Sequence, residues 1–315
     1  MAAPPTDTFE TYASVGNLDD LSNIIYNISP TDTPGLSSFE TTDSTAVLHE
    51  WQLDSLAAAV ATNYVEEGLD AVTDAVTATV RKSNTCQISD KVPRVSGTQQ
   101  AIQKAGRGDE LEYQIAKMAK ELKRDMETQI FANNAEVTGS SGTPREIGGI
   151  PAWLTSNLSE GAGATSSTGS GDNARTAGTA RAFTEVMLKE VLREAFDSGG
   201  DPDRIHVGAF NKQMMSTFVG NATRQVTAED RQLYASIDIY ESDFGSLEIV
   251  PNRFSGNGTA FVLQSDMWAI AYLRQFQLHN LAKTGDSERR QLLAEFTLEA
   301  RNQAASGAVY DLTTS

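Results

Sequence analysis

The chain has 315 residues, 42 of them acidic and 25 basic, which gives a formal net charge of −17 at pH 7. Proteins that grip duplex nucleic acid need a basic surface, so this charge argues against such a role; it favours either plain solubility or a surface that faces DNA without adhering to it. The 39% hydrophobic content is enough for a folded core, the longest apolar run is too short to span a membrane, and a single cysteine cannot form an internal disulfide.

The first 44 residues are rich in Thr, Ser, Asp and Pro and contain one short apolar stretch. Its apolar positions recur every three or four residues: Leu18, Leu21, Ile24, Ile25 and Ile28. This spacing predicts a short helix that ends before Pro30. We expect the rest to be an extended arm that lies on a partner surface. The N-terminus lacks the basic residues and apolar core of a secretory signal, which favours a cytosolic protein.

A long two-stranded excursion is predicted between residues 46 and 80. One side of its first strand is formed by alternate residues: Val47, His49, Trp51 and Leu53. Residues 72–80 alternate in the same way, and an acidic turn at residues 63–70 separates the two stretches. Because an isolated hairpin is only marginally stable in water, a projecting excursion should lie on another chain. The alternative is a hairpin that folds back on its own domain.

The strongest local pattern is an amphipathic helix over residues 108–133. Its apolar stripe has a spacing of three or four residues: Leu111, Ile115, Met118, Leu122, Met126 and Ile130. Asp109 begins an acidic first turn, which complements the helix dipole. Lys117 and Glu121 are spaced for an i,i+4 ion pair. About 25 residues at 1.5 Å each make a rod of roughly 38 Å, which indicates an elongated domain.

The second half of the chain begins with a Gly/Ser/Thr-rich segment, residues 155–181, which predicts a mobile surface loop or an interdomain linker. Helices are predicted beyond it at residues 183–196 and 211–219. Strands are predicted at residues 204–208, 260–263, 267–273 and 291–309, together with a hairpin formed by 235–240 and 247–250. We expect the last strand to pair with one far earlier in the chain.

No motif predicts catalysis, cofactor binding or a metal site. His49, His206 and His279 are far apart, and Cys86 has no neighbours typical of a reactive thiolate. The tripeptide at 243–245, Asp-Phe-Gly, occurs in protein kinases, but the glycine-rich loop and catalytic loop of those enzymes are absent, so a turn is expected. We therefore predict a non-enzymatic protein. A cytosolic hydrolase with an unrecognised carboxylate site is the alternative.

The C-terminal third resembles the major capsid protein of tailed bacteriophages. The resemblance rests on DMWAIAYLR (266–274), LAKTGDS (281–287) and EFTLEARN (295–302), and it extends to residues 237–253, 200–218 and 21–39, the last with SPTDTP. It spans nearly the whole chain apart from residues 155–181. The resemblance implies the α+β capsid fold of the Hong Kong ninety-seven lineage, with an N-terminal arm, an extended two-stranded loop, a peripheral domain with a long spine helix, and an axial α/β domain.

The resemblance also implies boundaries for these parts. They are an arm at 1–45, the extended loop and the start of the peripheral domain at 46–106, the spine helix and peripheral domain at 107–154, a flexible loop at 155–181, the axial domain at 182–276, and a return to the peripheral sheet at 277–315. By position, residues 46–80 correspond to the extended loop and residues 108–133 to the spine helix.

The implied function is that of a structural virion protein, made in the host cytoplasm, whose pentamers and hexamers form the icosahedral head around duplex DNA. Contact with DNA is expected to be non-specific, with no cofactor and no membrane. Only about 45 residues precede the excursion, so a separate scaffolding protein is expected, or none; a portal and a decoration protein are further expected partners. The candidate subunit contacts are Trp51, Glu66, Glu67, Lys283, Asp286 and Arg290. A cellular nanocompartment shell is the alternative.

Overall fold

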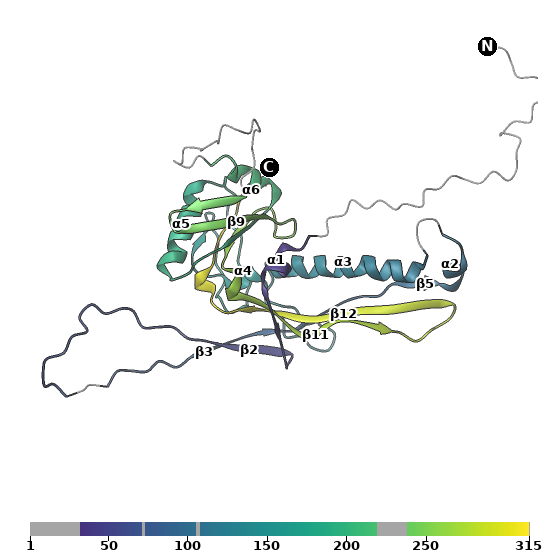
Figure 1. The fold of residues 1–315 in the computed structure, drawn as a ribbon, viewed down its shortest axis with the longest axis horizontal. Helices are drawn as coiled ribbons and strands as arrows, with labels where there is room; N and C mark the ends of the chain where they lie inside the picture. Colours follow the sequence, from purple (N-terminus) through teal and green to yellow (C-terminus); the bar gives the residue numbers. More distant parts are fainter. Residues whose placement is uncertain (1–31, 71–72, 105–107, 219–237, 315) are drawn as a thin grey trace, which may run out of the picture.

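The chain folds into two sheet-based units, from which one strand pair and its connecting loop project (Figure 1). The computed structural model describes residues 32–70, 73–104, 108–218 and 238–314. The helix expected at residues 18–28 and most of the expected arm lie outside these residues. Both units combine helices with sheets, so the α+β class is confirmed.

The first unit, here called the elongated unit, is a five-stranded sheet with a long helix packed along it. Its strands run in the order β1-β11-β12-β4, and β5 also pairs with β12. Only the β1–β11 pair is parallel. The strands are β1 (Glu40–Asp43), β4 (Gln87–Lys91), β5 (Arg94–Ser96), β11 (Trp268–Asn280) and β12 (Ser287–Ala300). The long β11–β12 hairpin gives the unit its length (Figure 1).

Helix α3 (Glu110–Phe131) confirms the helix expected at residues 108–133. Leu122, Met126 and Ile130 of the expected stripe are fully buried against the sheet. Asp109 caps the helix: its Oδ1 accepts hydrogen bonds from the backbone N–H groups of Leu111 and Glu112 at 2.8 and 3.1 Å. The remaining short helical elements of this unit and its junction are α1 (Pro34–Ser38), α2 (Gly97–Ala101), α4 (Ile150–Trp153), η2 (Ser265–Met267) and η3 (Gln303–Ala305).

The second unit contains a six-stranded mixed sheet in the order β6-β13-β10-β7-β9-β8. Its strands are β6 (Leu158–Ser159), β7 (Arg204–Val207), β8 (Ile239–Ser242), β9 (Gly245–Pro251), β10 (Ala260–Leu263) and β13 (Gly307–Val309). Helices α5 (Glu185–Asp197) and α6 (Ala209–Met215) pack on it. The predicted strands at 204–208 and 260–263, the helix at 183–196 and the Asp-Phe-Gly turn are confirmed, the turn lying between β8 and β9.

The C-terminal stretch differs from the single strand expected at residues 291–309. β12 ends at Ala300, η3 follows, and β13 joins the other sheet. The side chain of Asn302 caps η3 by accepting from Ala304 N–H at 3.1 Å, which breaks the extended conformation. The expected long-range pairing is confirmed, because β12 pairs with β4. The expected boundary at residues 276 and 277 falls inside β11.

The two-stranded excursion is present, but its second strand lies later than expected. β2 (Leu48–Leu53) pairs with β3 (Val80–Thr85), so the strand predicted at residues 72–80 is wrong for residues 73–79, and residue 72 lies outside the described residues. The described residues between 54 and 79 form no strand and are exposed; they project as a long loop (Figure 1). Alternation of Val and Thr fixes a strand only where one face is buried, and neither face of this segment is.

Residues 155–181, expected to be a mobile surface loop, pack against the six-stranded unit. They contribute β6, and Arg181 bridges to Leu312. The Arg175 side chain bonds Glu160 at 3.3 Å and Asp311 at 2.7 Å, and its guanidinium lies 4.1 Å from the centre of the Tyr310 ring. Burial is the largest single influence on the pKa of Asp311 and would raise it, but the hydrogen bonds from Arg175 and from the backbone N–H groups of Gly161 and Gly178 together lower it. Buried polar contacts thus replace the apolar anchors that this segment lacks.

Replacing Arg175 by Met should detach residues 155–181. It leaves the Glu160 and Asp311 carboxylates largely buried without their cation, and breaking a buried pair in this way costs about 3–5 kcal/mol. We expect a lower midpoint of urea unfolding and new proteolytic cleavage within residues 155–181. The exposed Arg193→Met serves as the control and should change neither. An unchanged midpoint in Arg175→Met would contradict the anchoring role.

Candidate assembly surfaces

The Glu127 carboxylate joins three parts of the chain. Glu127 lies on α3 and is completely buried. Its Oε1 accepts from Gly35 N–H at 2.8 Å and from the Asn252 side-chain amide at 2.7 Å, and its Oε2 accepts from Leu36 N–H at 2.8 Å. Burial raises the pKa of Glu127, and these donors oppose the rise. The carboxylate therefore ties α1 and the loop after β9 to the long helix.

The root of the excursion is fixed to the elongated unit. The Trp51 indole N–H donates to the Ala300 carbonyl at 2.9 Å, and the Trp51 ring centre lies 5.3 Å from that of Trp153. His49 Nε2 is 3.1 Å from Glu299, and this contact chiefly lowers the pKa of Glu299. Trp51, a candidate subunit contact, thus anchors β2 within its own chain.

Beyond this root, the described residues of segment 54–79 (here called the loop) are exposed. Leu56 and Val76 are 100% and 97% exposed, and Val60, Tyr64, Val65 and Leu69 are also more than half exposed. Glu66 and Glu67 lie here and are exposed. A folded protein does not normally display so many contiguous apolar side chains to water, so this loop has the character of a binding surface.

The candidate contacts Lys283, Asp286 and Arg290 lie together at the far end of the β11–β12 hairpin. Lys283 pairs with Glu288 of its own chain. The Asp286 carbonyl accepts from Gly97 N–H at 3.2 Å. Arg290 has no carboxylate within 4 Å among the described residues. The structure brings the three residues to one end of the molecule, but it does not pair them with one another.

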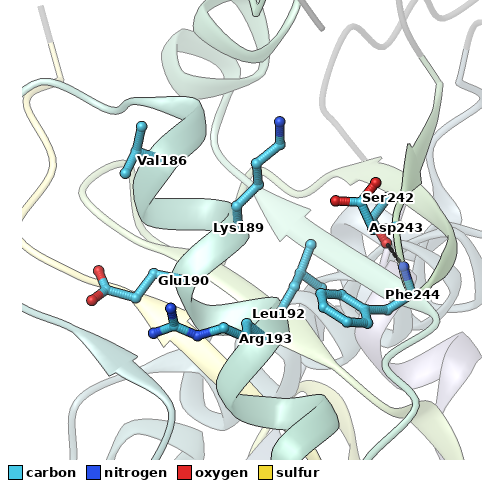
Figure 2. A pocket seen from close by; sticks show the side chains of 8 residues that line it. All are labelled: Val186, Lys189, Glu190, Leu192, Arg193, Ser242, Asp243 and Phe244. Carbon is cyan, nitrogen blue, oxygen red and sulfur yellow. Dashed lines mark hydrogen bonds between the residues drawn. The ribbon is translucent and has the colours of Figure 1, made fainter. Parts of the chain in front are cut away.

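A further surface, missed by the sequence analysis, lies between α5 and the β8–β9 turn (Figure 2). It is an open hollow of about 350 Å³ lined by apolar Val186 and Phe244 beside charged Lys189, Arg193 and Asp243. Val186 is 74% exposed, and Phe244 stacks on exposed Phe196 at 4.8 Å. The sequence did contain a signal for this surface: two large apolar residues, Val186 and Phe196, lie on the polar face of the helix predicted at residues 183–196.

Within the described part of the chain, the histidines and the cysteine considered in the sequence analysis are not grouped to hold a metal ion. His206 is buried between the rings of Phe39 and Phe131, at 6.3 and 5.2 Å, and neither ring nitrogen has a hydrogen-bond partner in the described part of the chain. Burial raises the pKa of the Cys86 thiol, which keeps it protonated. Over residues 32–70, 73–104, 108–218 and 238–314, no three His, Cys, Asp or Glu side chains are grouped to hold a metal ion.

A model of the SU10 major capsid protein family matches residues 5–313, almost the entire chain. The chain belongs to this family. It is 26% identical to the major capsid protein of Escherichia phage Phieco32, over 98% of this chain and 97% of the phage protein. This confirms the resemblance to tailed-phage capsid proteins drawn from the sequence.

Solved structures of the same fold include a viral and a cellular shell. The capsid of Cyanophage A-1(L) aligns with a TM-score of 0.64 and 12% identity, covering 96% of this chain and 98% of that chain. The holo-SrpI encapsulin complex of Synechococcus elongatus PCC 7942 aligns with a TM-score of 0.55 and 10% identity, covering 95% and 93%. The fold is that of the Hong Kong ninety-seven lineage.

The chain is a phage major capsid protein, a structural virion protein that forms the icosahedral head. The likeness to a cellular shell is one of fold, and the family match favours the viral role over the nanocompartment. None of the helices in the described ranges has the length and apolar composition required to cross a bilayer.

Changing Glu127 to Gln should destabilise the subunit. The amide places a donor where Oε1 or Oε2 now accepts, so at least one buried N–H group loses its partner at a cost of about 1–3 kcal/mol. Urea unfolding of the unassembled subunit measures the loss. Glu121→Gln, which alters a part-exposed i,i+4 pair on the same helix, is the matched control and should stay within about 0.5 kcal/mol of the wild type. Equal stability of the two variants would contradict the role of Glu127 in joining these three parts of the chain.

His206 should make the subunit sensitive to acid. Burial lowers the pKa of His206 from 6.5 to about 3. Between these two pH values, His206 is therefore protonated in the unfolded chain but not in the folded one. Stability should therefore fall as the pH drops below 6.5, by about 1.4 kcal/mol at pH 5.5 from this group. Unfolding of wild type and His206→Leu at pH 7 and 5.5 should show a smaller acid loss in the variant. The control is His279→Leu at an exposed position, which should keep the wild-type difference. Identical acid losses in all three proteins would refute this role.

Proposed function

We propose that this capsid protein works by association alone, with no covalent chemistry. The six-stranded unit serves as the axial domain and the elongated unit, with α3 as its spine helix, serves as the peripheral domain. Assembly takes place in the host cytoplasm, with a portal, a scaffolding protein and a decoration protein as partners. Packaged DNA meets the wall of the shell without specific contacts, in keeping with the net charge of −17.

The observation that carries this proposal is that the loop is exposed to solvent, while strand β2 at its base is fixed to the elongated unit. Trp51 and His49 hold β2 to the elongated unit, and beyond this fixed root the described apolar side chains of the loop are exposed. The loop's apolar side chains then lose contact with water only on another molecule. Because every subunit carries the same loop, each copy both covers a neighbour and is covered by one. The same contact is repeated between neighbouring subunits throughout a closed shell.

Removing the loop should separate folding from assembly. A variant in which Asn-Gly replaces residues 54–79 joins Leu53 to Val80, which already face each other in the β2–β3 ladder, by a two-residue turn. We expect a folded subunit with a thermal midpoint close to that of wild type, because the loop makes little contact with the body. It should sediment as a monomer or small oligomer where wild type forms shells. Shells of normal size from the variant would contradict the proposal.

The encapsulin-like fold supports a second candidate, a shell that encloses protein rather than DNA. The two differ in their contents. Particles recovered from cells that produce the natural phage proteins should contain nuclease-protected duplex DNA. Particles that instead hold one enriched protein and no DNA would favour the nanocompartment.

A further inference from the structure

Helix α3 carries a local cluster of cations. Residues 117–124 contain four cations and one acidic residue, Glu121, although the whole chain has a net charge of −17. Helix α5 differs, because its 13 residues contain two cations and four carboxylates. The positive charge of α3 therefore does not follow from the composition of the chain, and it asks for a partner.

These cations share the side of α3 that points away from the sheet. Lys117, Lys120 and Arg124 follow one another at intervals of three and four residues. This spacing places them on one side of the helix, opposite the buried Leu122 and Met126. Lys117 and Lys120 are exposed, and Arg124 is half-buried. In Figure 1, α3 lies on one side of the β11–β12 hairpin and the β2–β3 pair lies on the other, so the cations face away from the root of the loop.

Most of this charge is not neutralised by the chain itself. Lys120, Lys123 and Arg124 have no carboxylate within 4 Å among the described residues. Lys123 lies 5.8 Å from the centre of the Phe276 ring, and Arg124 lies 5.5 Å from that of Phe254. Such ring contacts orient a cation without cancelling its charge. The charge therefore stays available to an anionic partner.

Neighbouring segments add to the cluster. Arg253 is exposed and lies beside α3, because the next residue, Phe254, provides the ring that Arg124 contacts. Lys91 pairs with Asp125 at 2.6 Å and so neutralises a carboxylate on the flank of α3. We call the following five residues the cationic face: Lys117, Lys120, Lys123, Arg124 and Arg253.

The composition of the cationic face distinguishes between classes of partner. Along α3, all of which the structure describes, no large apolar side chain is exposed. A stable protein interface has an apolar centre, which this face lacks, whereas the backbone of duplex DNA is bound mainly by Lys and Arg. From Lys117 to Arg124 the helix rises about 10 Å, a length over which duplex DNA carries about six charges.

We propose that the cationic face binds the phosphate backbone of packaged duplex DNA without reading its sequence. The inference rests on the proposed assembly function and assigns the surface of the subunit that lines the inside of the shell. Exposed lysines act as point charges on phosphates, so the contact is sensitive to salt. The net negative charge of the rest of the chain repels the same DNA and keeps each contact weak. DNA is thereby positioned at the wall and remains free to leave it.

Neutralising two lysines tests the contact. Fluorescence anisotropy of a labelled duplex of about 30 base pairs with the unassembled full-length subunit, at about 50 mM salt, measures binding. Lys117→Gln with Lys120→Gln should weaken binding at least tenfold and lower the slope of log affinity against log salt by about two, because two phosphate contacts are lost. Lys117→Arg with Lys120→Arg keeps both charges and should bind within about threefold of wild type.

A matched control separates a local contact from net charge. Lys189→Gln with Arg193→Gln makes the same change in net charge on exposed positions of α5, and it also removes one i,i+4 ion pair. This variant should bind DNA like wild type. Circular dichroism should show that all variants are folded. Equal losses in the α3 and α5 variants, or no loss in the α3 variant, would overturn the proposal.

Photo-crosslinking locates the contact in DNA-filled heads. A photoreactive benzoylphenylalanine in place of exposed Ala116 on α3 should form adducts with DNA. The same replacement of Arg81 on β3, whose side chain is 71% exposed across the sheet, should form none. Adducts of the Ala116 variant with protein only would assign the cationic face to a protein partner and refute the DNA contact. If wild type never forms shells, the proposed function fails; if it forms shells but does not bind the duplex, only the inference about the cationic face fails.

Discussion

The buried Glu127 carboxylate is the constraint on which the arrangement of the two units depends. A charged oxygen pair inside a core is costly unless its lone pairs are filled, and three N–H donors from two distant segments fill them. The donors are in place only when α1 lies against α3 and the loop after β9 reaches the same point. A Cβ on Gly35 would collide with the Phe131 ring, so the close approach of α1 also needs glycine there. The orientation of the six-stranded unit on the spine is thereby specified by polar geometry as well as by packing.

Packing across the junction complements this polar contact. One core cluster contains Leu122 and Ile130 of α3 together with Phe261 of β10 and Tyr310, which follows β13. The apolar core is therefore continuous between the units. Two units held in one relative orientation suit a subunit whose exposed parts must contact neighbouring subunits at defined positions. The described residues of the loop beyond the β2–β3 root belong to neither core cluster.

The sequence predicts those helices and strands in which burial of one face makes apolar residues recur at a regular spacing. The α3 stripe and strand β10 follow their apolar patterns because one or both faces lie in the core. The Val/Thr alternation over residues 73–79 predicts a strand that the structure does not contain, because these residues face water on both sides. The Arg175 contacts join residues 136 positions apart in sequence, and no local pattern reports such pairs. Glu127 did leave a signal, since an acidic residue near a helix C-terminus is unfavourable without a partner. Among the candidate contacts, Trp51 lies at the fixed root, Glu66 and Glu67 lie in the exposed loop, and the other three lie at the far end of the β11–β12 hairpin.

Strand β12 has a mechanical consequence for the shell. Its C-terminal residue, Ala300, accepts the indole N–H of Trp51 at the root of the loop, and its first residues pair with β5 at the opposite end. Its fourteen residues, at about 3.4 Å each, form one continuous strand of roughly 48 Å between these points. A force directed along β12 acts nearly perpendicular to the ladder hydrogen bonds on either side. The ladder then resists in shear, where many bonds must yield together, rather than by peeling one bond at a time.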